Sequence, residues 1–134
     1  MQAIDDGFNQ YCRTFGQPIL VENISKFYGE KLNRKIDPLK EVLVGCGANG
    51  VLNSCMLGLV NQGDEIIIFE PLFPWYLDHV RMVGAVLKLV PLENDQDSGD
   101  WNFNSANLKS VLNEKTKILL LNSPHNPTGK CFSF

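Results

Sequence analysis

Residues 63–76, with the sequence GDEIIIFEPLFPWY, contain the most informative pattern for the architecture of this chain. Ile66, Ile67, Ile68 and Phe69 form a continuous apolar run, which is typical of a strand buried on both faces. Strands of this kind occur in parallel sheets that carry helices on either side. The stretch therefore predicts a central parallel strand.

Helical and strand patterns alternate in both directions from this run. Apolar residues recur at helical spacing where helices are expected, and short apolar runs mark the expected strands. The expected helices cover residues 18–32, 51–60, 75–83 and 104–112; the expected strands cover residues 41–44, 66–69, 86–90 and 118–121; and the expected loops cover residues 10–18 and 93–100. This order predicts an α/β fold, with alternating strands and helices around a mainly parallel sheet.

Three polar or glycine-rich segments each follow an expected strand, at residues 45–50, 70–76 and 122–130. In open α/β sheets, ligands bind beyond the carboxyl ends of the strands. We therefore expect all three segments to open on the same edge of the sheet and to form the binding site.

The first segment has the spacing G-x-G-x-x-G at Gly45, Gly47 and Gly50. Glycines after a strand allow a sharp turn, and the amides at the start of the next helix suit a phosphate. Glu70 lies 20 residues beyond Gly50, where a ribose-binding acid of a dinucleotide site would stand. The segment alone is compatible with a dinucleotide, with another phosphate, or with a plain strand-to-helix turn.

The other two segments offer a flat ring and amide groups. Phe73, Trp75 or Tyr76 could stack on a heterocycle, or could simply pack beneath the loop. Asn122 and Asn126 could hydrogen-bond a ring hydroxyl or a carboxylate, unless the segment is only a rigid turn. A flat ring, a phosphate and an amide together suggest a phosphorylated heteroaromatic cofactor.

Composition narrows the classes of function. The 134 residues suffice for one domain, and the net charge of −3 gives no basic surface for nucleic acid. The apolar runs are too short for a bilayer, and residues 1–6 do not resemble a secretory signal. The four cysteines lack metal-site spacing and are expected to be reduced thiols, although four could also pair. We expect no metal site and no nucleic-acid or membrane partner.

At this point the motifs resemble a known family. SPHNPTGK at residues 123–130 resembles the asparagine-proline-glycine signature of class I aminotransferases, which are pyridoxal-phosphate enzymes of fold type I. The resemblance is closest to the kynurenine aminotransferase and cysteine-conjugate beta-lyase branch and extends from about Phe8 to Ser133, through the segments FNQYCRTFGQP, KIDPLKEVLVGCGANGVL, GDEIIIFEPLFPWY, VRMVGAV and LNEKTKILLLNSPHNPTGK. It implies that residues 1–134 are part of the large, cofactor-binding domain, with residues 1–17 as a loop on the dimer and active-site side. It also favours pyridoxal 5′-phosphate over a dinucleotide.

The resemblance assigns a role to each matching residue. The implied contacts are Ala48, Asn49 and Gly50 with the cofactor phosphate, Phe73 stacked on the pyridine ring, Asn126 on the ring 3-hydroxyl, Asn122 beside it in the pocket, and Tyr11 on the cofactor phosphate of a partner subunit. The last contact implies a homodimer. Tyr76 and His125 lie in the same segments, but the resemblance gives them no definite role.

Two departures from the family pattern affect the expected chemistry. Asn49 stands where close relatives carry a tyrosine of the substrate pocket. A pocket lined by Asn49 and Asn126 should be wider and more polar, which leaves the preferred amino donor open. Lys130 does not match the Schiff-base lysine and is expected to be a solvated surface lysine. No residue of the chain matches that lysine, so we expect no catalytic residue here.

The resemblance implies pyridoxal-phosphate-dependent transamination between an amino acid and a 2-oxo acid, within a longer enzyme. The amino acid would be aromatic, or kynurenine- or glutamine-like. The expected compartment is the cytoplasm, with mitochondria as the alternative. The chain alone is expected to be inactive. One alternative is a truncated, non-catalytic subunit that binds cofactor or pairs with full-length relatives. A weaker alternative is a nicotinamide-binding half-domain built on the glycine segment and Glu70.

Overall fold

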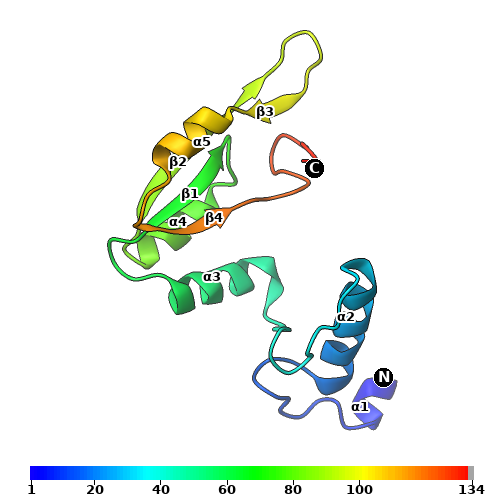
Figure 1. Cartoon of the computed structure of the whole chain (residues 1–134). Coiled ribbons are helices and arrows are strands. Elements are labelled where there is room, and N and C mark those ends of the chain that lie inside the picture. Colours follow the sequence, from blue (N-terminus) through cyan, green and yellow to red (C-terminus); the bar gives the residue numbers. More distant parts are fainter. Residues whose placement is uncertain (133–134) are drawn as a thin grey trace. The chain divides into compact units, whose positions relative to one another are not determined.

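The structure is a computed structural model that describes residues 1–132. Ser133, the last residue of the family resemblance, lies outside the described residues. The chain divides into two compact units, Met1–Val51 and Leu52–Phe134, and each is described by itself (Figure 1).

The first unit is built around α2 (Pro18–Lys31). Pro18 occupies the first turn, where its missing N–H is not needed. The side-chain oxygen of Gln17 caps the helix by accepting a hydrogen bond from the amide of Ile19 at 2.9 Å. A short helix, α1 (Gln2–Asp5), lies within the segment expected as a loop.

The expected strand at residues 41–44 is not formed, so this prediction is wrong. The amide of Val44 donates one hydrogen bond to the carbonyl of Phe15 at 2.9 Å, but the described residues contain no strand paired with this segment. Val44 instead packs closely against Gly16, whose φ of +130° suits glycine. An apolar run becomes a strand only where a neighbouring strand accepts its backbone hydrogen bonds.

The second unit contains a four-stranded sheet in the order β3-β2-β1-β4. Its strands are β1 (Glu65–Glu70), β2 (Val86–Asn94), β3 (Trp101–Phe103) and β4 (Thr116–Leu120). β1 pairs in parallel with β2 and with β4, so Ile67 lies opposite Lys88 on one side and Leu119 on the other. β3 pairs antiparallel with β2. The mainly parallel sheet confirms the predicted fold class.

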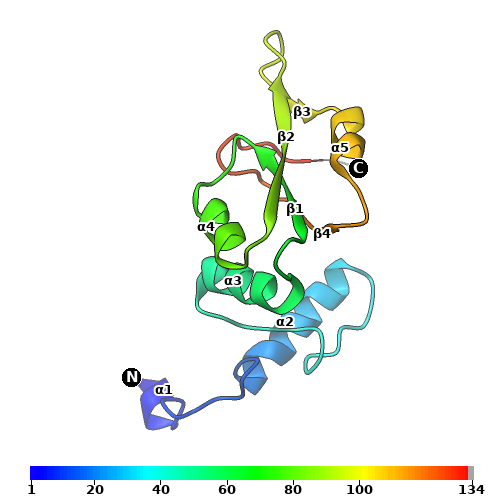
Figure 2. The ribbon, with the colours of Figure 1, turned by 90° about the vertical axis from the view of Figure 1, so that its left-hand side faces the viewer.

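Helices cover both faces of β1. Ile66 and Ile68 pack with buried residues of α3 (Gly47–Leu59) and α4 (Trp75–Met82). Ile67 and Phe69 face the other way, toward partly buried residues of α5 (Ser105–Val111). Figure 2 shows α4 and α5 on opposite faces of the sheet. The run predicted to be buried on both faces is therefore buried on both faces, with each of its four residues at most 2% exposed.

The segment expected as a polar loop at residues 93–100 is partly a hairpin. β2 continues to Asn94 and β3 begins at Trp101, with a turn between them. Leu92 opposite Phe103 anchors the pairing on the apolar face.

No helix among the described residues is long and apolar enough to cross a membrane.

Candidate cofactor site

Two of the three predicted segments leave the sheet at the same edge. β1 and β4 run parallel as neighbours, so the residues after Glu70 and after Leu120 both start from the carboxyl end of the sheet. The glycine segment belongs to the first unit, and no strand precedes it within the described residues. The Rossmann arrangement needs a strand directly before its glycines, so the geometry of this segment does not favour a dinucleotide site.

The segment after β1 places three aromatic rings together. Phe73 is half-buried, and its ring centroid lies 5.7 Å from that of Trp75 and 5.6 Å from that of Tyr76. Tyr76 is buried in the core, whereas Trp75 is 55% exposed. Tyr76 is therefore a core residue that packs under this segment. Phe73 keeps part of its ring accessible beside the core, which is compatible with stacking on a flat ligand.

The segment after β4, residues 122–130, forms a loop closed by its own hydrogen bonds; we call it the asparagine loop. The side-chain oxygen of Asn122 accepts a hydrogen bond from the amide of Asn126 at 2.8 Å. The carbonyl of His125 accepts one from the amide of Gly129 at 2.7 Å. Asn122 thus holds the loop, while the Asn126 side chain is exposed and able to meet a ligand.

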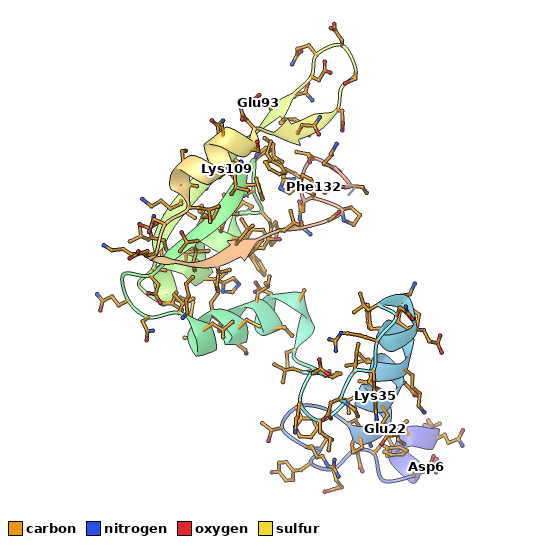
Figure 3. The ribbon with its side chains drawn as sticks, in the orientation of Figure 1. Asp6, Glu22, Lys35, Glu93, Lys109 and Phe132 are labelled. Atoms are coloured by element: carbon orange, nitrogen blue, oxygen red, sulfur yellow. The ribbon has the colours of Figure 1, made fainter. Side chains whose placement is uncertain are left out.

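His125 is the buried part of this loop. Its side chain is 5% exposed, and its Nδ1 lies 2.9 Å from the hydroxyl of Thr128. Burial lowers the pKa of His125 below its ordinary value. The ring of Phe132 packs edge-on against the imidazole and also reaches Phe69 and Phe103. Figure 3 shows Phe132 between the asparagine loop and the hairpin.

Lys130 is not a solvated surface lysine, so that expectation is wrong. Its side chain is 13% exposed, and its Nζ lies 2.6 Å and 2.9 Å from the two carboxylate oxygens of Asp100. The hydrogen bond from Lys130 holds the pKa of Asp100 below its ordinary value. The two residues are 30 positions apart, and nothing in their local sequence signals the pair. Folding brings them together by forming the hairpin.

The glycine segment opens α3. The helix begins at Gly47, four residues before the expected start at Val51, and its first turn contains Ala48, Asn49 and Gly50. Gly47 has a φ of +70°, a backbone conformation that glycine adopts without steric cost. The first-turn amides and the positive end of the helix dipole suit a phosphate. Tyr11, in the same unit, is fully exposed.

The residues present fit the phosphorylated ring that the sequence motifs suggest. Within the second unit, the exposed amide of Asn126 suits a ring hydroxyl and the half-buried ring of Phe73 suits a flat heterocycle. Within the first unit, the N-terminus of α3 suits a phosphate. Within residues 1–132, no cluster of three or more His, Cys, Asp or Glu side chains could hold a metal ion. The four cysteines are exposed and free, so none of them is in a disulfide.

A mainly parallel sheet with helices on both faces, and with an asparagine loop and an aromatic segment at its carboxyl edge, defines an α/β domain, a class in which ligands bind beyond the carboxyl ends of the strands. Residues 2–134 match the model of the family "Aminotransferase class I and II". The chain therefore belongs to the class I and II aminotransferases, a family that depends on pyridoxal phosphate.

Individual relatives agree with this assignment. Kynurenine–oxoglutarate transaminase 3 of Mus musculus is 44% identical over 137 residues, covering 98% of this chain and 30% of the relative. Kynurenine–oxoglutarate transaminase 1 of Homo sapiens is 41% identical, covering 93% and 31%. The structure of N-succinyldiaminopimelate aminotransferase from Mycobacterium tuberculosis superposes with a TM-score of 0.91 at 35% identity, covering 98% of this chain and 34% of that one. The chain spans about a third of the length of these relatives.

Proposed function

We propose that this chain is the cofactor-binding part of an enzyme that transfers an amino group between an amino acid and a 2-oxo acid. The observation that carries the proposal is the asparagine loop. It presents the exposed Asn126 at the same edge of the sheet as the aromatic segment, in a chain of the aminotransferase family. Pyridoxal phosphate bound there would supply an electron sink for chemistry at the substrate α-carbon.

In this proposal, three residues of the second unit hold the cofactor ring. Phe73, which is half-buried, would stack on the ring with the accessible part of its own ring. The amide of Asn126 hydrogen-bonds the ring 3-hydroxyl. Asn122 orients Asn126 through the 2.8 Å hydrogen bond to the Asn126 backbone amide. The hydrogen bond of Asn126 would tune the electron demand of the ring.

Residues of the first unit bind the phosphate and a partner subunit. Ala48, Asn49 and Gly50, in the first turn of α3, hold the phosphate, which the dipole of this helix favours. Tyr11 reaches the phosphate held by a second copy of the protein, so the enzyme is a homodimer. The full exposure of Tyr11 supports a role outside its own subunit.

The proposed amino donor is kynurenine, a glutamine-like amino acid or an aromatic amino acid. The names of the mouse and human relatives, both kynurenine–oxoglutarate transaminases, support this class. Asn49 and Asn126 are the proposed substrate-pocket residues, and Asn49 would make the pocket more polar. We place the enzyme in the cytoplasm, with mitochondria as the alternative. The chain's own lysines do not match the Schiff-base position, so the 134 residues alone would bind cofactor without turning over substrate.

The proposal predicts that the chain binds pyridoxamine 5′-phosphate through Asn126 and Phe73. This probe carries the ring hydroxyl and the phosphate but no aldehyde, so it cannot form imines with exposed lysines. A Trp101→Phe background leaves Trp75 as the only tryptophan, 5.7 Å from Phe73, and its emission reports binding. We expect Asn126→Ala to weaken binding by about 10-fold, because one hydrogen bond to the ring is lost.

Asn23→Ala is the matched control, because it removes an exposed asparagine of α2. It should leave the affinity unchanged. Pyridoxamine without phosphate should bind more weakly than the phosphorylated probe if α3 holds the phosphate. Equal affinity of the wild type and Asn126→Ala would contradict the assignment. Binding of nicotinamide dinucleotide in place of the probe would favour the half-domain alternative.

A further inference from the structure

An ion pair joins the asparagine loop to the hairpin of β2 and β3. Lys130 lies in the loop after β4, and Asp100 lies in the turn before β3. β3 and β4 are at opposite ends of the strand order, so the pair links segments that come from opposite edges of the sheet. Figure 1 shows the chain after β4 turning back toward the hairpin.

Asp100 is held in place independently of Lys130. Its Oδ1 accepts a hydrogen bond from the amide of Trp101 at 2.9 Å, and its Oδ2 accepts one from the side-chain amide of Asn102 at 3.2 Å. Its carbonyl accepts a hydrogen bond from the amide of Asp95 at 2.8 Å. A carboxylate fixed in this way loses little further conformational freedom when a cation binds it.

Lys130 transmits its position to the rest of the asparagine loop through the backbone. Its carbonyl accepts a hydrogen bond from the amide of His125 at 2.8 Å, and its amide donates to the hydroxyl of Thr128 at 3.2 Å. His125 directly precedes Asn126 in the sequence. The Lys130 side chain is only 13% exposed, so its ammonium group depends on Asp100 for compensation of its charge.

We infer that Asp100 and Lys130 are positioning residues, which fix the asparagine loop and thereby the place where Asn126 presents its amide. In this inference they act through the backbone of the loop and not through contact with a ligand. The inference rests on the proposed function only for the identity of the ligand that Asn126 meets. The fixing of the loop itself follows from the contacts of the ion pair.

The first measurement is amide hydrogen exchange of the whole chain, compared between a peptide covering residues 122–132 and one covering β1. Lys130→Met and Asp100→Asn should each raise exchange in the first peptide on the order of 10-fold and leave β1 unchanged, because only the loop is released. Lys130→Arg keeps the positive charge, so residues 122–132 should exchange as slowly in this variant as in the wild type. The exposed pair Asp78–Arg81 on α4 provides the matched controls Asp78→Asn and Arg81→Met, which should have no effect on the loop.

The second measurement is the affinity for pyridoxamine 5′-phosphate. We expect a loss of about 5-fold or more in Lys130→Met and recovery in Lys130→Arg, because a mobile loop must be ordered before Asn126 can bind. Unchanged exchange in both neutralised variants overturns the inference. Faster exchange with unchanged affinity also overturns it, because the pair would then stabilise the loop without positioning Asn126.

The two proposals can fail separately. If the wild-type chain does not bind the probe, the proposed function fails, while the exchange data still decide whether the ion pair fixes the loop. If Lys130→Met loses the helical circular dichroism of the wild type, the charge-reversed double variant Asp100→Lys with Lys130→Asp replaces it. Recovery of loop protection in that variant supports the inference, and continued rapid exchange overturns it.

Discussion

At the scale of single residues, His125 contributes to the asparagine loop as a neutral side chain. It is buried between Thr128 and the ring of Phe132, and burial lowers the pKa of its imidazole. Because a protonated imidazole would lose its hydration when buried, the fold favours the neutral form.

The pKa of His125 predicts how stability changes with pH. Above its ordinary pKa of 6.5, the imidazole is neutral in both the folded and the unfolded chain, and its contribution to stability is fully present. Below that pH the unfolded chain takes up a proton that the folded chain resists, so stability falls as the pH drops toward the lowered pKa. Urea unfolding at several pH values between about 7.5 and 5 measures this decline.

His125→Gln is the test variant, because glutamine keeps a polar side chain but does not titrate. Its stability should fall less over the same pH range than that of the wild type. An equal decline in both proteins would show that another group is responsible for the pH dependence.

At the scale of elements, β1 is the strand on which the second unit depends. It is the only strand of the described sheet with parallel neighbours on both sides, and its apolar residues supply both core clusters. β4, in contrast, has β1 as its neighbour on one side and no described strand on the other. The position of a strand in the sheet, more than its composition, therefore decides how much each of its apolar residues contributes to the stability of the second unit.

Ile67 and Leu119 allow this difference to be measured, because they lie directly opposite each other in β1 and β4. Ile67 is 0% exposed and Leu119 is 45% exposed. We expect Ile67→Ala to lower the free energy of unfolding by about 3 kcal/mol, through lost burial and the cavity left behind. Leu119→Ala should cost less than about 1 kcal/mol. Chemical denaturation checks both values, and equal losses would contradict the account.

At the scale of the whole molecule, the residues assigned to the cofactor are divided between the two units. Tyr11 and the first turn of α3 belong to Met1–Val51, whereas Phe73 and the asparagine loop belong to Leu52–Phe134. The chain spans about a third of the length of its relatives. Cofactor binding and substrate turnover therefore have to be measured separately for these 134 residues.

We predict that the purified chain, supplied with pyridoxal phosphate, kynurenine and 2-oxoglutarate, gives no turnover above the rate of the cofactor alone. The reason is chemical: in the proposed function Asn126 and Phe73 only orient the ring, and none of the chain's lysines is assigned the role of moving the substrate proton. Formation of glutamate from 2-oxoglutarate, measured by mass spectrometry, is the readout. Cofactor-dependent glutamate formation that is lost in Asn126→Ala would refute the prediction.

Several features of this protein could be predicted from the sequence because they depend on local pattern. The apolar run of β1, the proline at the start of α2 and the polar residues after β4 each carry a signal within a few residues. The family motif in residues 123–130 also predicted the segment that forms the loop with the exposed Asn126. These features have a local signal because proline restricts its own backbone and a continuous apolar run is typical of a strand that is covered on both faces.

Features that depend on distant partners become visible only in the folded chain. Residues 41–44 have a strand-like pattern but no strand to pair with in the described part of the chain. The hairpin of β2 and β3 forms because Leu92 and Phe103 meet on one face of the sheet. Lys130 is shielded because that hairpin brings Asp100 within 2.6 Å. The sequence determines which groups are available, whereas a hydrogen bond or an ion pair also requires the fold to bring its second partner within reach.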